Sequence, residues 1–184
     1  AGKGTQAKKL MEHYGLIHIS TGDLLRMEIA DETVLGLEAR KRIDKGELVP
    51  DDIVITMIKS LLDKNKDAKG FIFDGFPRTV VQARALDKML EKRNSFIDIL
   101  LTLNVEKEEI IRRILKRGKD SRRADDQDES IIRNRLKVYE KLTEPVMDYY
   151  HGQNKFIPIN GHGDEKEIYG RLCEEIDKVT KLIY

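Results

Sequence analysis

The sequence predicts an α/β fold in which a parallel sheet is covered by helices on both faces. Short apolar runs that suit buried strands alternate along the 184 residues with longer stretches of helical periodicity. Alternation of this kind is typical of βαβ units. No internal repeat, low-complexity tract or long linker interrupts it, so we expect a single domain over residues 1–184.

Local signals set the elements and their boundaries. The strand candidates are four runs rich in apolar residues: 16–19, 71–73, 97–105 and 156–159. The helical stretches alternate with them at 6–13, 22–28, 33–45, 51–65, 80–92, 107–117, 128–150 and 165–182. Ser20 or Thr21 can cap the second helix, and Pro77 ends the second strand because it has no N–H to donate. Residues 20–49 hold two helices and no strand, so we expect them to project from the sheet.

Composition limits the classes of partner. Apolar residues at 40%, charged residues at 36% and a net charge of +1 favour neither nucleic acid nor a membrane surface. The single cysteine, Cys173, argues against an internal disulfide or a thiolate zinc cluster and fits a reducing cytoplasm. No apolar run approaches the ~18 residues of a transmembrane helix, and no signal peptide is visible. We therefore expect a cytoplasmic protein.

The chain starts with a glycine-rich run around a lysine, Ala1-Gly2-Lys3-Gly4-Thr5-Gln6. Glycines let backbone N–H groups approach phosphate oxygens, and a lysine ammonium can reach the β and γ phosphates. The helix that follows points its positive end at the same anion. The run therefore indicates the second half of a phosphate-binding loop. The usual hydroxyl comes one place late, at Thr5, which keeps a plain glycine-rich helix start as the alternative.

A second signature, Asp74-Gly75-Phe76-Pro77-Arg78, follows the strand candidate at 71–73. Open α/β sheets place ligand groups at the carboxyl ends of strands. A carboxylate there commonly holds Mg²⁺, directly or through water, beside a phosphate loop. Pro77 stiffens the turn, so we expect Arg78 to project from a rigid loop. An ordinary turn would explain the apolar run but not the acid and the arginine at its end.

These signatures stand in order with Ile19-Ser20-Thr21-Gly22-Asp23 and Arg26, with Gly46-Glu47-Leu48-Val49-Pro50, and with Gln82. In order and spacing the set resembles the adenylate kinase family over nearly the whole chain. That family transfers a phosphoryl group reversibly from MgATP to AMP, making two ADP. The resemblance implies a P-loop doubly wound parallel sheet with mobile inserts. Its parts would be a core at 1–19, 50–116 and 128–184, an AMP-binding insert at 20–49 and a short lid at 117–127.

The resemblance assigns AMP to one group of residues. Thr21 and Arg26 would hold its base and phosphate, the backbone of residues 47–49 would line its adenine and ribose, and Arg78 would bind its α-phosphate. Gln82 can offer a donor and an acceptor to the adenine edge. The AMP set is Thr21, Arg26, Glu47, Leu48, Val49, Gly75, Phe76, Pro77, Arg78, Gln82, Arg123 and Arg135.

ATP is assigned by the same resemblance to a second group, in which the Gly163 carbonyl would accept the adenine amino group. On the sequence alone, Gly163 lies in a glycine-rich turn. The ATP set is Ala1, Gly2, Lys3, Gly4, Thr5, Arg117 and Gly163. The catalytic set is Lys3, Asp74, Arg78, Arg117, Arg123 and Arg135, with Asp74 holding Mg²⁺ through water.

The helical spacing around Arg135 supports its assignment as a phosphate ligand. It shares an apolar stripe with Ile131, Val138 and Leu142 and has no acidic residue one turn away. A guanidinium on such a stripe is costly unless it is paired. We therefore expect a phosphate oxygen as its partner. The charged run around it, basic over 112–123 and acidic over 125–129, is otherwise expected to be a solvated face.

The lid segment and the chemistry complete the expectations. Between Arg117 and Asp128 there is neither a cysteine nor a pair of histidines, which resembles the short-lid form without zinc. The scattered histidines are expected at the surface or satisfied in the core. The phosphate of AMP is already ionised near neutral pH, so no general base is needed. Catalysis would rest on positioning, charge neutralisation and exclusion of water by closure, in a monomer.

Three alternatives remain open. A pyrimidine monophosphate kinase of the same architecture would usually carry a small residue where Thr21 stands, so Thr21 with Gln82 favours AMP. A relative that uses GTP is possible, because the donor base would be contacted mainly by backbone and by Arg117. A non-catalytic nucleotide-binding module is conceivable because the phosphate loop is short at its start. The retention of Lys3, Asp74 and the arginines argues against that module.

The strand that precedes the phosphate loop in the family has no counterpart among the four strand candidates. Without a central strand, the N–H and C=O groups of both neighbours would lack partners, each at a cost of about 1–3 kcal/mol. We therefore expect a strand to be supplied, because the polypeptide is longer at its N-terminus or because a rearranged or split chain provides it.

Overall fold

The computed structural model describes residues 2–121 and 123–181, in which strands and helices alternate as predicted. The strands are β1 (Ile17–Ser20), β2 (Phe71–Asp74), β3 (Leu100–Asn104) and β4 (Phe156–Asn160). The helices are α1 (Lys3–Tyr14), α2 (Thr21–Ala30), α3 (Val34–Ile43), α4 (Asp51–Lys64), α5 (Val80–Glu91), α6 (Lys107–Asp120), α7 (Glu129–Val138), α8 (Glu144–His151) and α9 (Glu165–Lys181). Over the described residues, no helix is long and apolar enough to cross a membrane.

The strands form two parallel pairs. β1 pairs with β2, so that Ser20 lies opposite Asp74, and β3 pairs with β4, so that Asn104 lies opposite Asn160. Since the strands of each pair run in the same direction, the loops that follow β1 and β2 leave from one edge. The α/β class is confirmed. No described strand pairs with both β2 and β3 to join the two pairs, which agrees with the absence of a central strand among the four strand candidates.

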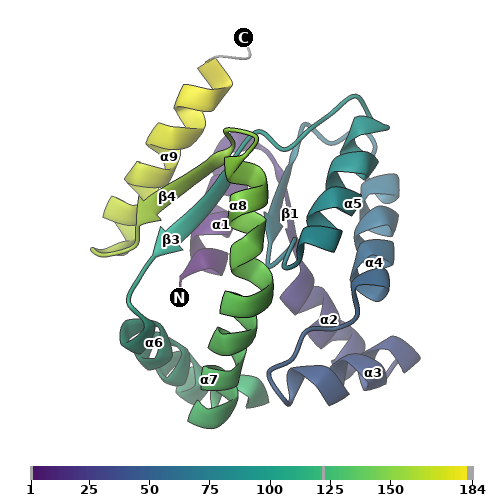
Figure 1. The fold of residues 1–184 in the computed structure, drawn as a ribbon, viewed down its shortest axis with the longest axis vertical. Helices are drawn as coiled ribbons and strands as arrows, with labels where there is room; N and C mark the ends of the chain where they lie inside the picture. The colour runs from purple at the N-terminus through teal and green to yellow at the C-terminus, as the bar shows by residue number, and fades with distance from the viewer. Residues whose placement is uncertain (1, 122, 182–184) are drawn as a thin grey trace.

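Helices surround the strand pairs (Figure 1). α1 and α9 pack against β4 through an apolar cluster built on Leu10, Ile159 and Leu172. α5 and α8 pack together through Ala83, Val146 and Tyr150. These contacts hold α1 and α8 in place relative to the strands. The phosphate-loop motif begins α1, and the Asp74 motif follows β2.

The segment 20–49 consists of α2, α3 and a loop, as predicted. Its Leu25 and Ala39 belong to the same buried cluster as Ile58 of α4, so the segment is anchored on the main core. The two helices approach closely at Gly36, where a Cβ atom would collide with the Glu28 carbonyl. The mobility of residues 20–49 relative to the core stays a prediction.

Several elements differ from the sequence predictions, most of all near the predicted lid and in the long helix after it. β3 is shorter than the predicted 97–105, and α6 continues to Asp120, into the segment expected to be the lid. A 3₁₀ turn at Ala124–Asp126 follows. The helix predicted over 128–150 is α7 and α8 joined by a π-helical turn, Tyr139–Thr143. A π turn adds one residue to the helical repeat, which regular spacing does not anticipate.

Candidate active site

The first turn of α1 presents the predicted phosphate-binding residues. Gly2 caps the helix with φ of +90°, a conformation that glycine adopts without strain. Lys3, Gly4 and Thr5 form the first turn, where free N–H groups and the positive end of the helix favour an anion. A Cβ atom at Gly4 would lie 3.5 Å from Asp74 Oδ2, so this turn and the carboxyl end of β2 are neighbours. Ala1 lies outside the described residues.

Asp74 lies at the end of β2, as predicted, next to a buried histidine. His18 Nε2 is 3.5 Å from Asp74 Oδ2 and has no hydrogen-bond partner among the described residues. The prediction that each histidine would be exposed or satisfied in the core is therefore wrong for His18. His18 belongs to the strand candidate at 16–19, but the pairing of that strand with β2 was not predicted from the sequence.

The loop between β2 and α5, residues 75–79 (the Arg78 loop), holds Arg78 by several hydrogen bonds. Arg78 Nε donates to the Gly75 carbonyl at 2.8 Å, and its backbone N–H donates to Gln82 Oε1 at 2.7 Å. Thr21 Oγ1 also donates to the Gly75 carbonyl, at 2.8 Å. Gln82 Nε2 donates to Asp51 Oδ1 at 2.8 Å, so its amide already binds the protein at both atoms. Contact of Gln82 with adenine through its second hydrogen or lone pair stays a prediction.

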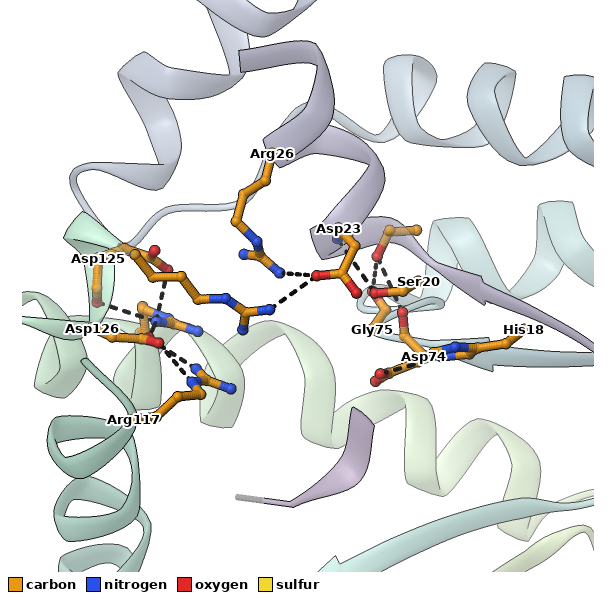
Figure 2. Close-up of polar contacts among 12 residues, drawn as sticks. His18, Ser20, Asp23, Arg26, Asp74, Gly75, Arg117, Asp125 and Asp126 are labelled. Carbon is orange, nitrogen blue, oxygen red and sulfur yellow. Dashed lines mark hydrogen bonds and ion pairs between the residues drawn. The ribbon is translucent and has the colours of Figure 1, made fainter. Parts of the chain in front are cut away.

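The N-terminal end of α2 carries a carboxylate between two arginines, the Asp23 cluster (Figure 2). Arg26 Nη2 and Arg123 Nη2 donate to Asp23 Oδ1 at 2.9 and 3.0 Å. Ser20 caps the helix by accepting from the Asp23 N–H. The Asp23 side chain keeps 50% of its surface exposed. Arg26 and Arg123, predicted as AMP ligands from segments far apart in the sequence, therefore meet at one exposed carboxylate.

A second group of charges, the lid cluster, joins α6, the 3₁₀ turn and α7. Arg117 donates to both oxygens of Asp126, at 2.7 and 2.9 Å. Arg135 Nη1 donates to Asp125 Oδ2 at 2.8 Å and to Asp126 Oδ1 at 2.9 Å. Asp126 is completely buried. The turn packs directly on α6 at Gly118, where a Cβ atom would overlap the Asp126 carbonyl.

Two predictions about this region are wrong. Arg135 does not lack an acidic partner, because Asp125 and Asp126 reach it from the 3₁₀ turn rather than from its own helix. These two aspartates are buried instead of forming a solvated face. Helical spacing could not reveal them, since they lie outside the helix that carries Arg135.

Burial and neighbouring positive charge lower the pKa of three cationic side chains of the site. The pKa of Lys3 lies below its usual value because surrounding protein removes water and because Arg78, Arg135 and Arg117 add positive charge, while Asp74 opposes them. Solvent still reaches the Lys3 side chain, so its desolvation is partial. Burial likewise lowers the pKa of Arg78, with Arg135 as the next cause. It also lowers the pKa of Arg123, with repulsion from Arg26 and Arg117. These shifts accord with the contacts that bring Arg26 and Arg123 to Asp23 and Arg117 and Arg135 to Asp126.

The remaining predicted residues lie at two edges of the site. The loop that carries Glu47, Leu48 and Val49 touches α7, since a Cβ atom at Gly46 would lie 2.8 Å from both the Arg135 side chain and the Ile131 carbonyl. Gly163, with φ of +113°, lies in the turn before α9, as predicted. A hollow nearby is lined by residues that follow β3 or lie on and after β4, including Glu106, Asn160 and His162.

Comparison with known proteins decides the family. The family model described as adenylate kinase matches residues 1–155. An adenylate kinase of Parabacteroides distasonis is 50% identical over 97% of this chain and 94% of its own length. Adenylate kinases of Bacteroides thetaiotaomicron and Flavobacterium psychrophilum are 48% and 49% identical over the same shares of each chain. The chain belongs to the adenylate kinase family.

Membership of the adenylate kinase family confirms the resemblance, the fold class and the phosphotransferase activity predicted from the motifs. Transfer between ATP and AMP is the supported reaction, and neither the pyrimidine kinase nor the non-catalytic module is favoured. Sequence reasoning missed the carboxylates that hold the arginines of this adenylate kinase: Asp23, Asp125 and Asp126. One signal for the last two was present, the abrupt change from basic to acidic residues.

Proposed function

We propose that this member of the adenylate kinase family binds MgATP and AMP between the first turn of α1, the Arg78 loop, α2 and the lid cluster. One observation carries the proposal: cationic side chains from separate elements converge on one region. They are Lys3, Arg26, Arg78, Arg117, Arg123 and Arg135. They outnumber the carboxylates interspersed among them, which are Asp23, Asp74, Asp125 and Asp126. The excess of positive charge suits the phosphate chains of two nucleotides.

The two nucleotides would approach from opposite sides of Arg78. Lys3 and the N–H groups of Gly4 and Thr5 would bind the triphosphate, because they lie at the positive end of α1. Arg26 and Arg78 would bind the phosphate of AMP, and residues 47–49 would line its base. Arg117, Arg123 and Arg135 would neutralise the phosphoryl group in transit. A preorganised cluster of arginines stabilises charge without having to reorient during the reaction.

Asp74 fits the Mg²⁺ ion that adenylate kinases use with ATP. It is the carboxylate at the end of β2, its Oδ2 faces the first turn of α1, and it lies where a water-mediated contact to the ion could form. Asp74 would hold the ion through water, and the ion would supply positive charge that offsets the charge of the phosphates. Among the described residues, no group of three or more potential ligands forms a cage for a metal ion. A single carboxylate with waters and substrate phosphates suits Mg²⁺, which keeps much of its hydration.

We also propose that the enzyme works as a monomer in the cytoplasm, with ATP, AMP and ADP as its partners and without zinc. The single cysteine and the modest net charge support this proposal.

The proposal is tested by measuring ADP formation with ATP or GTP as donor and AMP, CMP or UMP as acceptor. We expect ATP with AMP to give the highest kcat/KM. Lys3→Met removes the charge that follows the transferred group, so kcat should fall by about 10³-fold with little change in AMP affinity. Lys8→Met, at an exposed position on the same helix, is the matched control and should keep the parent's kcat. Equal activities of the two variants would contradict the assignment of the phosphate loop.

A further inference from the structure

The long helix that carries Arg135 changes its winding before it reaches the core. α7 passes into the π-helical turn Tyr139–Thr143 and then into α8, in one continuous run (Figure 1). The Glu144 N–H donates to the Tyr139 carbonyl, five residues back. The extra residue rotates α8 by roughly 100° relative to α7. Ile132 can therefore pack on α6 while Val146 packs on α5.

The same turn directs a hydroxyl at the Arg78 loop. Thr143 is its last residue, and Thr143 Oγ1 donates to the Arg78 carbonyl at 2.9 Å. The Arg78 N–H, on the other side of the residue, donates to Gln82 Oε1 at 2.7 Å. Side chains from two different helices therefore hold the peptide groups before and after Arg78. This leaves the backbone at Arg78 little freedom to rotate.

The two anchors connect Arg78 to different parts of the fold. Gln82 is fixed by Asp51 at the start of α4, which also accepts from Thr79 Oγ1 at 3.1 Å. Thr143 connects the loop to the helix that carries Arg135. Arg135 repels the Arg78 guanidinium, as the lowered pKa of Arg78 indicates, with burial as the larger cause. Two like charges that must act on one phosphoryl group need such external anchors to stay together.

We propose that Thr143 is a positioning residue for Arg78, which fixes the distance of its guanidinium from the phosphate of AMP. The inference rests on the proposed role of Arg78 in binding AMP. The π turn has a function in this account, because it sets the rotation at which the Thr143 hydroxyl meets the Arg78 carbonyl. Loss of the hydroxyl releases the peptide group after Arg78, and binding of AMP then has to restore the geometry.

The test compares Thr143→Val, which removes the hydroxyl at similar size, with Thr143→Ser, which keeps it. We expect Thr143→Val to lower kcat/KM for AMP about tenfold, in line with the loss of one partly buried hydrogen bond. KM for ATP at saturating AMP should change less than about twofold, since Lys3 lies on another element. Thr143→Ser should recover most of the loss. Thr56→Val, whose hydroxyl donates to the Asp52 carbonyl within α4, is the control and should match the parent.

A double-mutant cycle separates positioning from a general loss of stability. In an Arg78→Ala background, Thr143→Val should cause no further loss in kcat/KM for AMP. An unchanged kcat/KM in Thr143→Val overturns the inference. So does an equal loss for AMP and ATP that persists in the Arg78→Ala background, because it marks a structural role. If Arg78→Ala itself leaves kcat/KM for AMP unaltered, the proposed AMP site is wrong and the role of Thr143 falls with it.

Discussion

The Asp23 cluster and the lid cluster both pair arginines with aspartates, but they differ in burial. The Asp23 carboxylate is half exposed, and each of its arginines gives it one hydrogen bond. Asp126 is fully buried and accepts two hydrogen bonds from Arg117 and one from Arg135 (Figure 2). The first arrangement is typical of weak surface pairs, and the second of pairs whose disruption is costly.

The difference indicates two kinds of arginine in one site. Arg117 and Arg135 are held by buried carboxylates, so we expect their remaining N–H groups to be positioned before a nucleotide binds. Arg26 and Arg123 share an exposed carboxylate that a phosphate can replace at little cost, because water competes for that pair already. In this account the lid cluster is fixed, whereas the Asp23 cluster exchanges its carboxylate for substrate.

The largest expected effect is on rate, from removing an arginine of the fixed cluster. Arg117→Ala should lower kcat by about 10³-fold and act mainly through ATP. Arg26→Ala should act mainly by raising KM for AMP, since it removes an exchangeable ligand. Initial rates with each nucleotide varied in turn measure both. Arg112→Ala, an exposed arginine of α6 paired with Glu109, serves as control. If Arg26→Ala raised KM for ATP alone, the assignment of residues to the ATP site and the AMP site would have to be reversed.

Next in size is the effect on stability of forcing the lid cluster apart. Gly118→Ala places a methyl group against the Asp126 carbonyl and should lower the free energy of unfolding by about 1–3 kcal/mol, with a lower Tm. Gly170→Ala is the control, because a Cβ atom at that helical position meets nothing within 4 Å. That helical substitution should stabilise by about 0.5–1 kcal/mol. Equal Tm values for the two variants would show that the turn does not need its close packing on α6.

A smaller effect is expected on how the free energy of unfolding depends on pH. Burial alone would raise the pKa of Asp126, but its bonds to Arg117 and Arg135 hold that pKa below its usual value. A carboxyl with a lowered folded pKa stabilises the fold fully above about pH 4, the usual value for an unfolded aspartate. That stabilisation is lost as the pH falls through the folded pKa. Denaturant unfolding of the parent and of Asp126→Asn should therefore differ most above pH 5 and converge below pH 4. A constant difference would refute the linkage.

The smallest effect is expected at the exposed cluster. Asp23→Ala should change the free energy of unfolding by less than about 1 kcal/mol, because a half-exposed pair is screened by solvent. Urea unfolding at low and high salt measures this, with the exposed Asp67 replaced by Ala as control. A loss as large as that from Gly118→Ala would remove the distinction between the two clusters.

The sequence predicted the positions of the proposed ligands better than it predicted the residues that support them. Lys3, Asp74 and Arg78 stand in motifs whose local chemistry indicates phosphate. The structure places Lys3 at the start of α1, Asp74 at the end of β2 and Arg78 in the loop that follows β2. The residues that support these ligands are distant in the sequence. Asp23 is 100 residues from Arg123, and Thr143 is 65 residues from Arg78. Local periodicity carries no information on such pairs. The π turn was missed for the same reason, since its cause is packing on two separate surfaces.

A crystal structure with an inhibitor that joins ATP and AMP in one molecule tests the exchange most directly. Arg117 Nε should stay within hydrogen-bond distance of Asp126 Oδ2, which is 2.7 Å from it without ligand. Arg26 and Arg123 should both leave Asp23 and bind the phosphate of the AMP part. Arginines that stay on Asp23 while the phosphate binds elsewhere, or an Arg117 that abandons Asp126, would contradict the account.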